Sequence, residues 1–285
     1  MNSNGSTAGI SSIVIATDGS VYADVAAECS GWLALHTGAE VTALYVIDIR
    51  RIAGHFITHL PEILESFPSE GIADRVKDYY KQRGNEALKR AAAICERYGV
   101  KCRTELRTGN VVSVVADAAA QTDLLVIGER GEDEELETGF LGSVTEKLVR
   151  KAERPLLLTG LRVREFRKAL LAYDGSEAAQ RAMKMLARLA AALRMEVDAV
   201  QMVEEGEPTT ALDQVVKFFK DVPVHLSTHY LLSDTHAVII EHAKEINCDL
   251  MVMGAYDNWV ADSMSLGTTT EYLIRNSPVP VLLHH

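Results

Sequence analysis

Basic residues are in short supply in this sequence. Its 285 residues include 29 Lys and Arg against 40 Asp and Glu, so the formal net charge is -11 at pH 7. General binding to DNA or RNA depends on basic side chains that neutralise phosphates. We therefore expect no direct contact with nucleic acid.

Cysteine and long apolar runs are scarce as well. The cysteines show no C-x-x-C spacing, and three of the four lie within apolar patterns, which favours reduced thiols in a core over a redox or metal role. The longest apolar runs, such as residues 124–127, are far too short to cross a bilayer. Residues 1–9 are small and polar and lack the basic and apolar regions of a signal peptide. These absences predict a cytoplasmic protein that does not enter a membrane.

Signatures of several enzyme classes are also missing. The sequence has no Gly-x-x-x-x-Gly-Lys-Ser/Thr phosphate loop, and Gly128-x-x-Gly131 is not the dinucleotide fingerprint. Ser20 and Ser143 have no histidine in a recurring relation to them, so a nucleophilic hydrolase is poorly supported. A set of charged residues is interpreted as a solvated face: Asp24, Glu28, Glu129 and Arg130.

Two pairs of histidines have a spacing that can indicate a metal site. His55 and His59 lie four apart in a possible helix, but no third ligand is obvious nearby, so an ordinary helix face is preferred. His225 and His229 lie four apart in a predicted strand, where that spacing spans about 13 Å, too far for one ion. We predict no metal site formed by protein side chains.

The sequence does contain a duplication. Residues 15–20, Ile-Ala-Thr-Asp-Gly-Ser, return as Leu-Ala-Tyr-Asp-Gly-Ser at 171–176, and residues 142–150 return at 267–275. In both halves, short apolar runs alternate with stretches of helical periodicity, which predicts a parallel sheet covered on both faces. The fold class is therefore α/β, with two tandem doubly wound parallel-sheet domains.

The two predicted domains, residues 1–160 and 161–285, are not equal in length. Asp18 and Asp174 are 156 positions apart, whereas Gly128 and Gly254 are 126 apart, so the first domain carries about 30 extra residues. They fall in an apolar, helical segment at about 50–80, which we expect to pack over the second domain or to form a lid. A long helix over 76–97 follows it.

The repeated turns are the candidate binding residues. Ligands of such sheets bind outside the carboxyl ends of the strands, where Asp18 and Asp174 follow the first strand of each half. An Asp-Gly-Ser turn can equally cap the next helix, and both interpretations stay open. Gly128, Gly131 and Gly142 precede a predicted helix that begins with Ser143, and glycines and a helix N-terminus suit a phosphate.

Together these motifs resemble the universal stress protein family, here as a tandem member, over residues 12–285. Its most specific element is a Gly-two-Gly-nine-Gly-Ser/Thr pattern, which in ATP-binding members wraps the phosphates. The resemblance implies ATP or AMP as the ligand, with any Mg²⁺ held through the phosphates. The implied nucleotide-binding residues are Ala16, Thr17, Asp18, Val46, Gly128, Gly131, Gly142, Ser143 and Val144. The implied weaker second site consists of Tyr173, Asp174, Gly254, Gly267, Thr268 and Thr269.

Both halves depart from the family pattern. The first has ten residues between Gly131 and Gly142, five of them acidic, and close like charges cost roughly 1 kcal/mol per pair beside a phosphate. The second has Asp257 where the pattern has its second glycine. We therefore expect the first site to be the better one.

Three functions follow from these residues. The leading hypothesis is a stress-response regulator or sensor that binds an adenine nucleotide and is not a fast enzyme. The alternative is a nucleotide-independent interaction scaffold, in which the apolar strands 156–158 and 281–283 pair across a domain or subunit boundary. Such pairing within the chain makes a pseudo-dimer, and it also allows a homodimer. The minor alternative is a slow ATPase, for which the sequence supplies carboxylates but no placed base.

Overall fold

The computed structural model describes residues 9–48, 72–131, 141–151, 153–162, 165–204, 210–255 and 268–285. In the first half of the chain, the elements are β1 (Ser12–Ala16), α1 (Val21–Thr37), β2 (Glu40–Asp48), α4 (Ile72–Glu96), β3 (Cys102–Gly109), α5 (Val111–Ala119), β4 (Leu124–Gly128), α6 (Ser143–Lys151) and β5 (Leu156–Thr159). In the second half, they are β6 (Lys168–Ala172), α7 (Glu177–Leu193), β7 (Glu196–Val203), α8 (Ala211–Phe219), β8 (Leu226–Leu232), α9 (Ala237–Glu245), β9 (Leu250–Gly254), α10 (Thr268–Asn276) and β10 (Val281–His284).

The described strands form one sheet in the order β3-β2-β1-β4-β5-β10-β9-β6-β7-β8. Each half contributes five parallel strands with its first strand in the middle, which confirms the predicted α/β fold with tandem domains. The halves join at β5 and β10, which pair antiparallel with Leu157 opposite Leu282. The predicted pairing of the apolar strands within the chain is therefore confirmed. Because the junction is antiparallel, the carboxyl ends of the strands point in opposite directions in the two halves.

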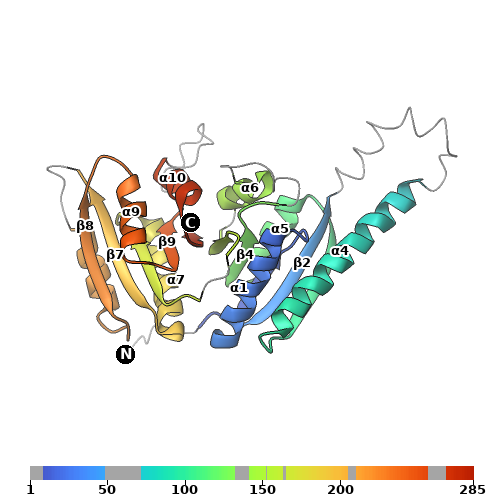
Figure 1. Ribbon diagram of the computed structural model, residues 1–285, viewed down its shortest axis with the longest axis horizontal. Helices are drawn as coiled ribbons and strands as arrows, with labels where there is room; N and C mark the ends of the chain where they lie inside the picture. Colours follow the sequence, from blue (N-terminus) through green and yellow to red (C-terminus); the bar gives the residue numbers. More distant parts are fainter. Residues whose placement is uncertain are drawn as a thin grey trace, which may run out of the picture.

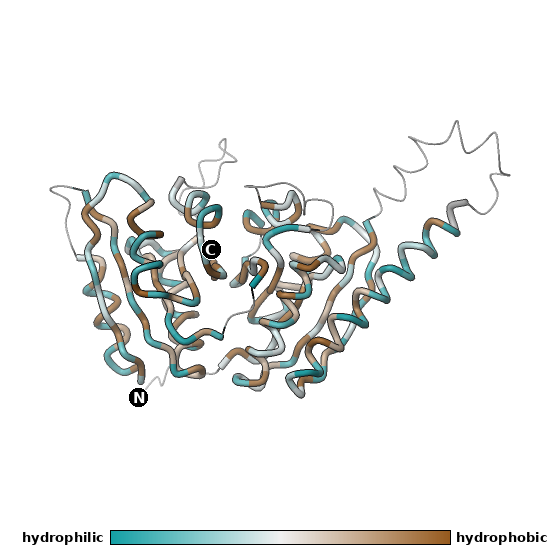
Figure 2. The backbone as a smooth tube through the Cα atoms, in the orientation of Figure 1, coloured by the Kyte–Doolittle hydropathy of each residue, from teal (hydrophilic) through white to brown (hydrophobic). Residues whose placement is uncertain are grey.

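Helices cover both faces of this sheet (Figure 1). Buried apolar side chains of the sheet pack against α1, α4, α7 and α8 in one cluster. In a second cluster they pack against α5, α6, α9 and α10. Strand β4, Leu-Leu-Val-Ile-Gly, lies between β1 and β5 and is buried at every position, as a strand covered on both faces requires. Figure 2 shows this concentration of hydrophobic residues along the strands. Within the described ranges, no helix is both long and apolar enough to cross a membrane.

The duplicated Asp-Gly-Ser turns have the same local structure in both halves. Gly19 and Gly175 each have a φ of 86°, a conformation that residues with a Cβ rarely adopt. Ser20 caps α1 by accepting a hydrogen bond from the Ala23 backbone N–H, and Ser176 caps α7 in the same way. The capping role considered for the turn is therefore real, but the serine performs it and the aspartate does not.

The extra segment of the first half is only partly described. Residues 49–71 lie outside the described residues, so its predicted role as a lid or as a cover of the second domain stays a prediction. The described part, 72–80, belongs to α4, which begins four residues earlier than the predicted 76. This helix packs against α1, β2 and β3 at the end of the molecule away from the second half (Figure 1).

Packing of α4 also corrects the prediction of a solvated charged face. Asp24 of α1 pairs with Arg90 of α4, and Glu28 pairs with Arg97 and accepts a hydrogen bond from the Tyr98 hydroxyl. Burial raises the pKa of Asp24, and the charge of Arg90 opposes that rise. These carboxylates join two helices, and sequence periodicity could not show the second helix beside them.

Candidate functional site

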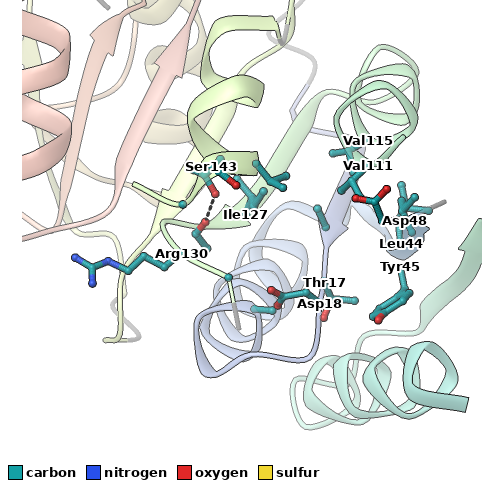
Figure 3. A pocket seen from close by; sticks show the side chains of 18 of the residues that line it. Thr17, Asp18, Leu44, Tyr45, Asp48, Val111, Val115, Ile127, Arg130 and Ser143 are labelled. Carbon is teal, nitrogen blue, oxygen red and sulfur yellow. Dashed lines mark hydrogen bonds between the residues drawn. The ribbon is translucent and has the colours of Figure 1, made fainter. Parts of the chain in front are cut away.

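A pocket opens at the carboxyl ends of β1, β2 and β4, with α5 and α6 beside it (Figure 3). All nine residues predicted for the first site line it: Ala16, Thr17, Asp18, Val46, Gly128, Gly131, Gly142, Ser143 and Val144. They come from three strand ends and one helix start that are up to about 130 positions apart in the chain. The fold thus brings the predicted set together in one place.

Asp18 has two different surroundings for its two carboxylate oxygens. Oδ1 accepts a hydrogen bond from the Ser20 backbone N–H at 3.0 Å, which holds the turn after β1. Oδ2 faces the glycine loop, because a Cβ placed on Gly131 would lie only 2.8 Å from it. The absence of a side chain at Gly131 is what allows the loop to approach this carboxylate.

The start of α6 is tied to the end of β4 by two hydrogen bonds. The Gly142 backbone N–H donates to the Glu129 carbonyl at 2.9 Å, and the Thr145 hydroxyl donates to the Gly128 carbonyl at 2.9 Å. The Glu146 backbone N–H then donates to the Gly142 carbonyl, which begins the helix. These bonds hold the N-terminus of α6, with its partial positive charge, at the mouth of the pocket.

Gly128 has a packing role that the sequence did not reveal. A Cβ on it would lie 2.6 Å from the Tyr22 Cβ, so its hydrogen allows α1 to approach β4 closely. Gly254 has the same role in the second half, where a Cβ would lie 2.5 Å from the Ala179 backbone nitrogen of α7. For both glycines, the repeat therefore reflects helix-to-strand packing as well as any contact with a ligand.

The pocket has one apolar side, formed by β2 and α5. Leu44, Val111 and Val115 lie there (Figure 3), and Val46 of β2 and Ile127 of β4 also line the pocket. Sequence reasoning named only Val46 among these residues. Seven other lining residues were not predicted either: Ala23, Tyr45, Ile47, Asp48, Tyr80, Arg130 and Thr145. Asp48 ends β2 at the same edge as Asp18, and that position was a signal available in the sequence.

The charged groups are unevenly placed around the pocket. Asp48 lies beside Val111 on the apolar side, whereas the Arg130 side chain extends away from Asp18 (Figure 3). The neighbouring Glu129 does not line the pocket, and burial raises its pKa against the opposing charge of Arg130. The acidic residues of the long loop, which belong to 132–140, lie outside the described residues.

The second half departs from this geometry. Tyr173, at the position of Thr17, is buried in the apolar core, and its hydroxyl donates to Gln214 Oε1 at 2.8 Å. Asp174 is exposed and holds its turn through Ser176, and the Thr269 hydroxyl lies 3.4 Å from His236 Nε2. Gly267, Asp257 and the side chain of Thr268 lie outside the described residues. A large buried ring thus stands where the first half has a threonine at the pocket wall.

The sequence model of the universal stress protein family matches residues 9–160 and 213–285. The chain belongs to the universal stress protein family. A universal stress protein of Synechocystis sp. is 26% identical over 281 residues, which is 95% of this chain and 98% of that protein. Another, from Methanocaldococcus jannaschii, is 34% identical over 148 residues, which is 51% of this chain and 79% of that protein.

Solved structures of universal stress proteins share the fold. A universal stress protein from Archaeoglobus fulgidus superposes with a TM-score of 0.77 at 23% identity, and the match covers 96% of this chain and 97% of that one. A universal stress protein structure from Pseudomonas aeruginosa gives a TM-score of 0.59 at 14% identity over 98% of this chain and 94% of that one. Both matches span the two halves, so the tandem arrangement is shared by these members of the family. Binding of adenine nucleotides is typical of the family.

Proposed function

We propose that this universal stress protein binds one adenine nucleotide, ATP or AMP, in the pocket of its first domain. The bound nucleotide regulates its shape or its choice of partner in a stress response. The observation that carries the proposal is the convergence of Asp18, the glycine loop and the N-terminus of α6 on one pocket with an apolar side. We take the two domains as residues 1–160 and 161–285, since β5 ends at Thr159 and β6 begins at Lys168.

The nucleoside lies on the side of β2 and α5 in this proposal. Val46, Val111 and Ile127 offer apolar surface to the faces of an adenine ring, whose transfer from water they favour. Asp18 and Asp48 flank this surface with acceptors for ribose hydroxyls or a base amino group. Carboxylates accept such bonds well but repel phosphates, which supports placing the nucleoside and not the phosphates beside them.

The phosphates lie toward Gly131, Gly142 and Ser143. The first turn of α6 presents backbone N–H groups and a partial positive charge, and the glycines let the ligand approach the backbone. Ser143 contributes a hydroxyl at the first position of the helix. Mg²⁺ would enter this site through the phosphates, with no protein carboxylate required.

The pocket supports a regulator better than an enzyme. Among the described residues that line it, there is no histidine or lysine, and Asp18 and Asp48 supply the carboxylates. Asp48 lies on the nucleoside side, beside Val111, whereas Asp18 faces Gly131 through Oδ2 and holds the turn after β1 through Oδ1. Rapid phosphoryl transfer needs a positioned nucleophile as well as charge stabilisation, and the described lining offers only the second.

The first test is to denature the purified full-length protein without added nucleotide and to identify any released small molecule by mass spectrometry. About one adenine nucleotide per chain is expected if binding is tight enough to survive purification. If nothing is released, calorimetry with ATP and Mg²⁺ decides the question. No heat in that titration would reject nucleotide binding and leave the scaffold as the function.

A variant then tests the place of the phosphates. Gly142→Asp puts a negative charge at the start of α6, and it should weaken nucleotide binding without abolishing the fold. Unchanged nucleotide affinity in calorimetry would remove the proposed phosphate site. Phosphate release with Mg²⁺ or Mn²⁺, compared with Gly131→Asp, tests the ATPase alternative, and equal rates would exclude turnover in this pocket.

A further inference from the structure

A second cluster of polar side chains lies in the second domain, away from the nucleotide pocket. Asp198 of β7 is flanked by His229 of the edge strand β8 and His242 of α9. Asp198 Oδ1 lies 3.1 Å from His242 Nε2, and Asp198 Oδ2 lies 3.3 Å from His229 Nε2. The two imidazole rings are 5.0 Å apart between centroids, so the three side chains face a common point.

The spacing of these atoms matches that of ligands around one small cation. Zinc binds imidazole nitrogen and carboxylate oxygen at about 2.0–2.1 Å, so adjacent ligands of a tetrahedral site are about 3.3 Å apart. The two Asp198 distances have this length, each to a different oxygen of the carboxylate. One ligand atom of each residue lies within 4.8 Å of the other two, so the three ligands need only draw closer together around a bound ion.

Burial distinguishes the three ligands. Only 8% of the Asp198 side chain is exposed and 12% of the His242 side chain, whereas 47% of the His229 side chain is exposed. A buried carboxylate needs partners for its charge, and a cation supplies them more fully than two neutral imidazoles do. The exposed side of His229 leaves room for a fourth ligand from solvent.

The cluster is not a product of the duplication. Strand register places Thr42 at the position of Asp198 and Glu105 at the position of His229. The sixth residue of α9 is His242, and the sixth residue of the nine-residue helix α5 is Ala116. Since the first domain has the same fold without these side chains, the fold itself does not require them.

We propose that Asp198, His229 and His242 form a zinc-binding site that links the edge strand β8 to α9 and leaves one coordination position open to water. In the metal-free protein, each Nε2 carries a proton and donates it in a hydrogen bond to Asp198. When the metal binds, Zn²⁺ takes the place of the proton on each Nε2. Each imidazole takes up a proton at Nδ1 from solvent in exchange and coordinates as a neutral ligand, so no net proton is released. The metal thereby adds a link among three elements that already pack through apolar side chains.

The test uses the full-length protein, treated with a chelator and dialysed, and titrated with Zn²⁺ in the absence of nucleotide. Calorimetry should give one Zn²⁺ per chain, and saturation should raise the melting temperature. His229→Gln removes one half-exposed ligand and should weaken binding by about 100-fold or more, because even second-shell changes cost 10–100-fold. His225→Gln, at an exposed histidine just before β8, is the matched control and should bind as the wild type does.

Two further results decide the ligand set. Asp198→Asn keeps the volume of the side chain and should also lose zinc binding, and its melting temperature without metal shows whether it folds. Co²⁺ in place of Zn²⁺ should give visible absorption typical of nitrogen and oxygen ligands. Equal zinc affinity in wild type and His229→Gln, no binding at all, or a thiolate-to-metal band from the cysteines would each overturn the proposal. No nucleotide is present, so this outcome is independent of the proposed function.

Discussion

Replacing Asp18 by Asn separates the role of this carboxylate in the turn from its role toward a ligand. The bond from the Ser20 backbone N–H goes to Oδ1, and the amide oxygen of Asn can accept it equally well. The second oxygen, which faces Gly131, becomes an NH₂ group and can no longer accept. We therefore expect the fold to be kept within about 0.5 kcal/mol, since Asp and Asn stabilise such turns equally.

The loss should appear in nucleotide affinity. A hydrogen bond to a charged acceptor contributes about 1.5–3 kcal/mol. Since 1.4 kcal/mol corresponds to a factor of ten, loss of one such bond to a ribose hydroxyl or base amino group weakens binding roughly 10- to 150-fold. The loss would be larger if Asp18 accepted two bonds from the ligand.

The duplication provides a matched control for this experiment. Asp174 holds an equivalent turn through a 2.9 Å bond to Oδ1 from the Ser176 backbone N–H, next to the buried Tyr173 ring. Asp174→Asn should therefore leave the calorimetric affinity for ATP and Mg²⁺ unchanged, and urea unfolding should show that both variants are folded. Equal losses in the two variants, or no loss in Asp18→Asn, would refute the assignment of the ligand to the first domain.

Three further predictions concern stability. Gly128→Ala places a Cβ 2.6 Å from the Tyr22 Cβ and should lower the free energy of unfolding in urea by about 1–3 kcal/mol. The control is Gly9→Ala, whose Cβ would have nothing within 4 Å, and it should change the free energy of unfolding by less than about 0.5 kcal/mol. Burial raises the pKa of Glu129 above 4.5, so the folded state binds the proton more tightly than the unfolded chain and the free energy of unfolding falls as pH rises through the raised pKa. The variant Glu129→Gln should not show this decrease. An identical dependence of stability on pH in the variant and the wild type would contradict the prediction. Burial lowers the pKa of His284 from 6.5 to about 4, so the unfolded chain takes up the proton first and the free energy of unfolding decreases as pH falls from 6.5 to about 4. Unfolding curves of His284→Gln, measured over this pH range, should not show that decrease.

The sequence determined those features that depend on neighbours along the chain. The strand-turn-helix units follow from the alternation of apolar runs with helical periodicity. The conformation of a turn is determined by its own residues, as the equal φ of Gly19 and Gly175 shows. The repetition of these units gave the tandem fold, and Asp18, Gly131 and Ser143 could be named because parallel sheets place strand ends at one edge. The pairing of the two short apolar strands 156–158 and 281–283 could also be anticipated, and the structure adds its antiparallel register.

Only the tertiary structure decided which distant side chains meet. His229 was set aside because His225 is too far along the same strand, but the fold supplies Asp198 from the next strand and His242 from a helix. Tyr80 lines the pocket for the same reason, because it comes from α4, whose position relative to the strand ends no local pattern encodes. The physical reason is that secondary structure depends on interactions between residues a few positions apart. A site is formed by packing contacts between residues tens of positions apart, and a single sequence records those contacts only indirectly.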